Sequence, residues 1–126
     1  MPSERAQIAR RGLALFESRD FDAGLELLCP DAEWDVSEIL GGGVYCGHSE
    51  IRAHWEMITT EVWERIQMDV ERLTEQGDQV VAHVRFRGTG AGSGVEIDVP
   101  VVWVATFRGN RFSRVKLSLA ADAGVA

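Results

Sequence analysis

The sequence is poor in cysteine, lysine and proline, and it has no long apolar run. Its two cysteines, Cys29 and Cys46, form no CxxC motif, so we expect two reduced thiols rather than a disulfide or a metal site. No stretch approaches the roughly 20 apolar residues that span a bilayer. The N-terminal segment "MPSERAQIARR" lacks the apolar core of a signal peptide, which predicts a cytoplasmic protein with no membrane partner.

Positive charge is also scarce, because 13 basic residues stand against 20 acidic ones and give a net charge of −7. The arginines do not cluster into a stripe, so nucleic acid is not an expected partner. The three histidines are far apart and no HExxH motif occurs, so we predict no metal and no cofactor. With 45% hydrophobic and 26% charged residues in 126, the chain predicts one folded domain over residues 1–126.

The stretch "FRGTGAGSGVEI", residues 86–97, places glycines at 88, 90, 92 and 94. Neither the dinucleotide-binding spacing nor a Walker Gly-Lys-Ser/Thr occurs there, and the only lysine is Lys116. A phosphate loop needs a helix N-terminus after it, whereas strand-like patterns flank this stretch on both sides. We therefore favour a flexible hairpin over a nucleotide site, with one strand face bare enough for close approach of a neighbour.

The first half of the chain predicts three helices. Ser3 caps a helix that runs to about Arg19. Asp20 caps a short second helix that Pro30 ends. A third helix begins near residue 48, and its apolar residues recur at helical spacing: Ile51, Trp55, Ile58 and Val62.

The second half changes to a two-residue period, which is typical of strands. The alternating segments are "RIQMDVERL", "VVAHVRFRG", "VEIDVPVVWVATF" and "RFSRVKLSL", and a short strand "DAEWDVS" precedes the third helix. Turn residues separate the four long segments, so we expect them to pair antiparallel. Helices followed by antiparallel strands indicate an α+β fold.

Four segments in this order are similar to the SnoaL-like branch of the NTF2-like superfamily: "ALFESRDFDAGLELLCPDAEWDV", "YCGHSEIRAHW", "GDQVVAHVRFRGTGAGSG" and "VWVATFRGNRFSRVKL". The resemblance implies a cone in which three N-terminal helices pack on a curved, mostly antiparallel sheet and enclose a cavity. It also implies a homodimer formed through the sheet. The superfamily includes isomerases, cyclases, epoxide hydrolases and pocket proteins, so the resemblance alone does not choose a function.

Candidate catalytic residues come from the strand at 80–87, where His83, Arg85 and Arg87 share one face. Matching the ketosteroid isomerase branch from "D-x-D-x-G" at residues 20–24 implies that His83 and Arg85 face the cavity. There they would form a general acid or base beside an anion stabiliser. The alternative is that the arginines face water and pair with acidic residues of a neighbouring strand.

The same matching does not reproduce the isomerase mechanism. The positions of that branch's tyrosine donor, carboxylic acid donor and catalytic aspartate hold Gly12, Trp103 and Val36. Asp35 is one residue from the third of these, so it reaches the cavity only if a bulge shifts the register. We keep Asp35 as a third catalytic candidate on that condition.

Four tryptophans are many for a chain of this length. They either form core alone or also line a cavity with flat apolar walls. The residues predicted to bind substrate are Trp34, Tyr45, His54, Trp55, Trp63, Val101, Trp103 and Leu117. The predicted partner is a small apolar or aromatic molecule, bound with or without acid–base catalysis of the isomerase, cyclase or hydrolase type. The alternative is a non-catalytic ligand-binding or dimerisation module.

Overall fold

The computed structural model describes residues 3–39 and 42–119, which form three α-helices and six strands. A short π-helix, Ile58–Val62, follows the third α-helix. The elements are α1 (Glu4–Ser18), α2 (Phe21–Glu26), β1 (Leu28–Asp35), β2 (Val44–Cys46), α3 (Gly47–Met57), β3 (Trp63–Gln76), β4 (Gln79–Gly90), β5 (Glu96–Arg108) and β6 (Arg111–Leu119). The predicted α+β class is confirmed.

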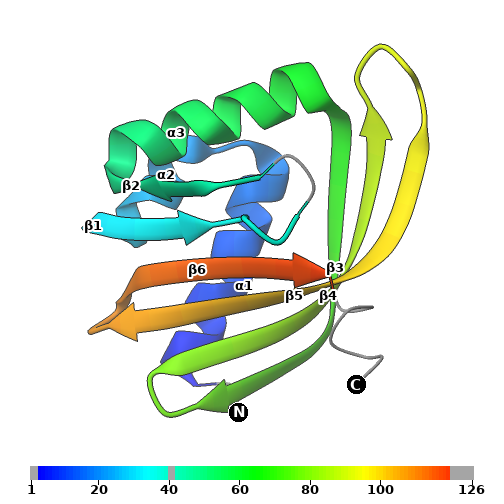
Figure 1. Ribbon diagram of the computed structural model, residues 1–126. Helices are drawn as coiled ribbons and strands as arrows, with labels where there is room; N and C mark the ends of the chain where they lie inside the picture. Colours follow the sequence, from blue (N-terminus) through cyan, green and yellow to red (C-terminus); the bar gives the residue numbers. More distant parts are fainter. Residues whose placement is uncertain (1–2, 40–41, 120–126) are drawn as a thin grey trace.

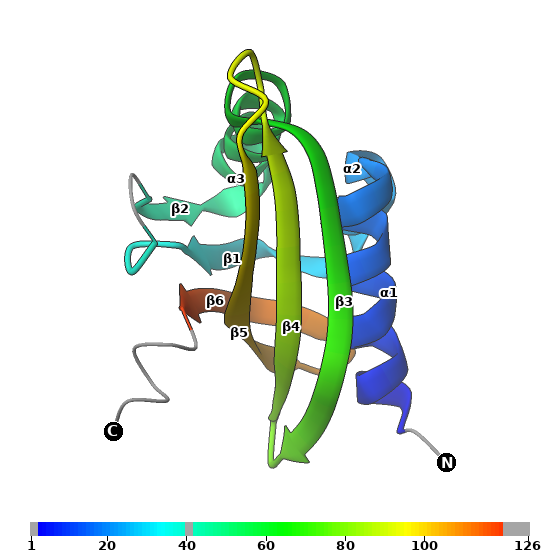
Figure 2. The same cartoon turned by 90° about the vertical axis from the view of Figure 1, so that its right-hand side faces the viewer.

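The six strands form one sheet in the order β2-β1-β6-β5-β4-β3. Neighbours are antiparallel except β1 and β6, which are parallel. The sheet is strongly twisted and not closed: β3, β4 and β5 run vertically in Figure 2 while β1, β2 and β6 cross the view. The three helices lie on its concave side (Figure 1), as the resemblance implied.

The predicted helix starts follow from local capping. The Ser3 hydroxyl accepts the N–H of Ala6 at 3.1 Å, and the Asp20 carboxylate accepts the N–H of Ala23 at 3.3 Å. Helix α2 ends at Glu26 rather than at Pro30, because Leu28 already pairs with Phe112 of β6. The prediction therefore made this helix too long and β1 too short.

The third predicted helix is correct as far as Met57, where the backbone changes to the π-helix. Ile51 and Trp55 of its apolar stripe are buried, whereas Val62 is 40% exposed. The wider π turn interrupts the helical spacing of the stripe, although Ile58 and Val62 still face the space between the helices and the sheet. Strand β2 was not predicted, since its three residues are too few to show a period.

The glycine-rich stretch is the hairpin between β4 and β5, as predicted. Gly88 lies in β4, and a Cβ atom there would be 2.8 Å from a ring carbon of Trp63. Gly92, in the turn, has a φ of 79°, which residues with a side chain rarely adopt. The absence of a side chain at Gly88 thus leaves room for the indole ring of Trp63.

Within residues 3–39 and 42–119, no helix is long and apolar enough to cross a membrane. Both cysteines are free thiols; Cys29 is buried and Cys46 is exposed.

Candidate functional site

An internal cavity of about 540 Å³ lies between the concave face of the sheet and the helices. Its lining comes from α1, α2, α3, the π-helix and the strands β1, β3, β4, β5 and β6. Pockets of about 300–1,000 Å³ with mostly apolar walls are typical of sites for small molecules. The cavity therefore has the size and the lining of a ligand site.

The alternation of the strands determines which side chains reach the cavity. In β4, Val80, Ala82 and Val84 are buried on the concave face, and Phe86, the next residue on that face, lines the cavity. In β5, Val101 and Trp103 line it from the neighbouring strand. The inner face of the sheet is thus almost wholly apolar where it meets the cavity.

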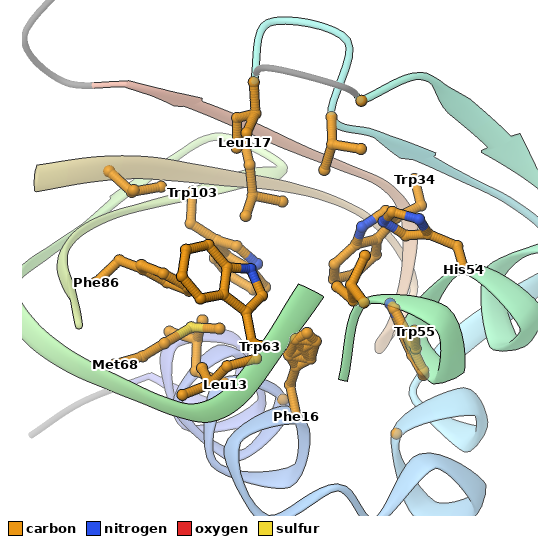
Figure 3. A pocket seen from close by; sticks show the side chains of 18 of the residues that line it. Leu13, Phe16, Trp34, His54, Trp55, Trp63, Met68, Phe86, Trp103 and Leu117 are labelled. Carbon is orange, nitrogen blue, oxygen red and sulfur yellow. The ribbon is translucent and has the colours of Figure 1, made fainter. Parts of the chain in front are cut away.

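Aromatic rings form two opposing walls in Figure 3. On one side, the rings of Trp34 and Trp55 meet edge to face, with centroids 5.2 Å apart. On the other side, Trp63 meets Phe86 in the same way, also at 5.2 Å. Edge-to-face packing is a preferred geometry of aromatic pairs, so the two rings of each wall stabilise one another.

The structure brings seven of the eight predicted substrate-binding residues to the cavity: Trp34, His54, Trp55, Trp63, Val101, Trp103 and Leu117. The eighth, Tyr45, does not line it. Its ring stacks on the His54 imidazole instead, with centroids 4.1 Å apart and planes inclined by 16°. Tyr45 therefore packs against the lining residue His54 and is not itself part of the cavity wall.

His83 and Arg85 lie on the outer face of β4, so their predicted placement in the cavity is wrong. Arg72 donates a hydrogen bond to His83 Nε2 at 3.0 Å, and Arg85 donates to Asp98 at 2.6 Å. Arg87 pairs with Asp69 at 3.0 Å on the same face. An unpaired cation against apolar walls loses hydration at high cost, whereas on the outer face each arginine pairs across strands. This placement agrees with the alternative in the sequence analysis, in which the arginines face water and pair with acidic residues of a neighbouring strand.

Asp35 also points away from the cavity, because its neighbours Trp34 and Val36 are the lining residues of this segment. The pairing of β1 with β6 is irregular between Leu28 and Glu33, yet Asp35 stays on the outer face. Its carboxylate accepts hydrogen bonds from the Ser37 hydroxyl at 2.6 Å and from Arg114 at 2.9 Å. The Ser37 hydrogen bonds hold the pKa of Asp35 below its ordinary value.

His54 is the titratable side chain that lies deepest among those described in the cavity wall, with 7% of its surface exposed. Burial lowers the pKa of its imidazole, because the charged form loses hydration. Its Nδ1 atom is buried without a hydrogen-bond partner, as is Nε1 of Trp55. The ring is therefore neutral near pH 7.

Sequence reasoning missed several residues of the wall. Phe86 and Met68 lie on the apolar faces of β4 and β3, so the strand alternation would have found them. Asp20 was recognised as a helix cap, yet it also lines the exposed rim of the cavity. Phe16, which lies within the first predicted helix, also reaches the cavity.

Among the described residues, no cluster of three or more His, Cys, Asp or Glu side chains could hold a metal ion.

The family model for the SnoaL-like domain matches residues 9–115. The chain belongs to the SnoaL-like family. The match covers most of this SnoaL-like protein and includes every strand except the last residues of β6. No curated protein matches it.

Solved structures share its fold at low sequence identity. An NTF2-like protein of unknown function from Burkholderia pseudomallei K96243 is 21% identical, with a TM-score of 0.86 over 98% of this chain and 95% of that one. TerC, co-crystallised with polyporic acid, is 24% identical, with a TM-score of 0.84 over 98% and 96%. A protein with a ketosteroid isomerase-like fold from Catenulispora acidiphila DSM 44928, in complex with trimethylamine, is 18% identical, with a TM-score of 0.79 over 93% and 92%. These likenesses show the fold of the SnoaL-like protein.

Proposed function

We propose that this SnoaL-like protein binds a small, apolar, ring-shaped molecule in its internal cavity. The observation that carries the proposal is the cavity of about 540 Å³, into which all four tryptophans of the chain face. Flat apolar walls favour a planar ring system, because stacking and burial of apolar surface both increase with ring area. The complex of TerC with polyporic acid is consistent with a small-molecule ligand in this fold.

The test is a titration of tryptophan emission with a rigid apolar ring compound such as fluorene. We expect saturable quenching, since four indoles line the cavity. Val101→Phe adds a ring inside the cavity and should weaken binding at least tenfold. Val102→Phe adds the same ring to the other face of β5 and is the matched control. Absence of saturation, or equal binding by both variants, would contradict the proposal.

Acid–base catalysis on the bound molecule is the second candidate function. It depends on residues other than the three catalytic residues predicted from the sequence. His83, Arg85 and Asp35 do not line the cavity, whereas His54 and Asp20 do. The test is deuterium exchange at the carbon beside the carbonyl of β-tetralone, a cyclic ketone, followed by NMR. Exchange faster than in buffer, and lost in both His54→Phe and Asp20→Asn, supports an enzyme; exchange at the buffer rate supports the non-catalytic binding module.

We also propose that two copies of the chain pair through the outer face of the sheet. No helix of the described residues covers β3, β4 and β5 on this side (Figure 2). Val81 and Val104 are directly opposite each other there, Val102 is opposite His83, and the Arg85–Asp98 ion pair lies farther along the same face. A dimer mass in sedimentation analysis, reduced to a monomer by Val104→Arg, is the expected result. A monomeric wild-type protein would exclude the pairing.

The cytoplasmic location stays a prediction.

A further inference from the structure

Few side chains of the cavity wall carry polar atoms, and four of these six side chains are tryptophans. Trp34, Trp55, Trp63 and Trp103 each contribute one indole N–H, which donates a hydrogen bond and cannot accept one. Beyond these, the described lining has two polar side chains, those of His54 and Asp20. Asp20 is at the exposed rim and already accepts the N–H of Ala23. Among the side chains of the described lining, hydrogen-bond donors therefore outnumber acceptors away from the rim.

These donors are unused by the protein itself. None of the four indole N–H groups makes a hydrogen bond with the part of the chain that the structure describes. Of these four nitrogens only Nε1 of Trp55 is buried as well as unpaired, and buried polar groups in proteins nearly always have a partner. The other three are unpaired but not buried, and a ligand in the cavity is in a position to supply an acceptor to them.

His54 also lines this wall, and its two ring nitrogens differ in burial. Its Nδ1 is both buried and unpartnered, so Nε2 is the ring nitrogen left for a ligand. A buried N–H without an acceptor is rarer than a buried lone pair without a donor, so we assign the proton of the neutral ring to Nε2. Protonation of the ring would place a second N–H at Nδ1 without an acceptor, which agrees with the lowered pKa of His54.

Contacts with neighbouring residues fix the orientation of the imidazole. Tyr45 stacks on it at 4.1 Å, and His54 stands on α3 next to Trp55. Figure 3 shows His54, Trp34 and Trp55 together on one wall, facing Trp63, Phe86 and Met68. A ring held between the two walls would thus present one edge to His54.

We propose that His54 determines the ligand specificity of the cavity by donating a hydrogen bond from Nε2 to a neutral carbonyl oxygen at the edge of an apolar ring molecule. The inference rests on the proposed function and names the ligand class as cyclic ketones. Carboxylates are excluded because no arginine or lysine is among the described lining residues, and an unpaired buried charge is costly. With the His54 proton on Nε2, a hydroxyl group finds no side-chain acceptor beside it for its own proton.

The test compares three compounds with one ring skeleton: fluorene, fluoren-9-one and fluorene-9-carboxylate. We expect wild-type protein to bind fluoren-9-one about three- to tenfold more tightly than fluorene, which is the usual net effect of one neutral hydrogen bond. The carboxylate should bind at least tenfold more weakly than fluorene. The carbonyl stretch of bound fluoren-9-one, measured by infrared difference spectroscopy, should move to lower wavenumber.

Variants connect these results to His54. His54→Phe should reduce the ketone preference to about onefold and return the carbonyl stretch to its position in an apolar solvent. His54→Gln places an amide N–H near the same point and should keep part of both effects, which separates the hydrogen bond from loss of packing. His48→Phe, a histidine that does not line the cavity, should behave as wild type. Far-UV circular dichroism checks that each variant folds.

Two outcomes overturn the inference while leaving the proposed function in place. One is equal binding of fluorene and fluoren-9-one by the wild-type protein. The other is a ketone preference, or a shifted carbonyl stretch, that survives in His54→Phe. Saturable binding of none of the compounds would instead refute the proposed function, and this inference with it.

Discussion

Replacing Trp55 by alanine tests whether the tryptophans are structural as well as part of the cavity wall. Trp55 is 4% exposed, and its ring contacts those of Phe16, Phe21 and Trp34 at centroid distances of 6.0, 5.5 and 5.2 Å. Removal of a buried aromatic side chain usually costs about 3–5 kcal/mol. A domain of 126 residues is stable by about 6–19 kcal/mol, from about 0.05–0.15 kcal/mol per residue, so the variant folds but is much weakened.

The assay is urea unfolding followed by far-UV circular dichroism. With an m-value of about 2 kcal/mol/M, a loss of about 4 kcal/mol lowers the midpoint by about 2 M. Trp63→Ala is the matched control, because Trp63 is half-buried and its ring pairs with that of Phe86 alone among the described aromatic contacts. We expect about half the loss there. An equal or larger loss for Trp63→Ala would refute the reasoning.

Three further predictions concern other parts of the molecule. Gly88→Ala should destabilise by about 1–3 kcal/mol in urea unfolding, because the added Cβ would be 2.8 Å from the Trp63 ring; no loss would contradict this contact. Between pH 7 and pH 5, the free energy of unfolding of the wild-type protein should decrease more steeply than that of His54→Phe. The two slopes should differ by at most about 1.4 kcal/mol per pH unit. The lowered pKa makes the unfolded chain bind the proton first, so equal slopes would contradict it. His83→Ala and Arg85→Ala should leave fluorene binding unchanged in the emission titration, since both residues are on the outer face; a tenfold loss would place them in the site.

The sequence was most informative where structure is decided locally. Ser3 and Asp20 mark helix starts because each side chain accepts an N–H three residues ahead. The two-residue period located β4, β5, β6 and most of β3, whose pairing with β4 shifts in register between Val70 and Arg72. The end of α2 was not predictable in this way, because it depends on the pairing of Leu28 with Phe112, far away in the chain.

The candidate site was predicted in part. The alternation of β4 separates two faces but does not say which one is concave, and here the apolar face of Val80 and Val84 is turned inward. His83 and Arg85 were assigned to the cavity by analogy with an enzyme branch, although their charge fits the outer face better. The tryptophans lie in the cavity wall because large apolar residues near a concave sheet have few other places to lie, and His54 reaches the wall beside Trp55 on α3.

The most direct test of the central claim is a crystal structure of the protein grown with fluoren-9-one. The account predicts one ligand per chain inside the cavity, with its rings between the wall of Trp34 and Trp55 and the wall of Trp63 and Phe86. Its oxygen should be within hydrogen-bond distance of His54 Nε2. A ligand bound only on the outer surface, with the cavity filled by repacked side chains, would contradict the account.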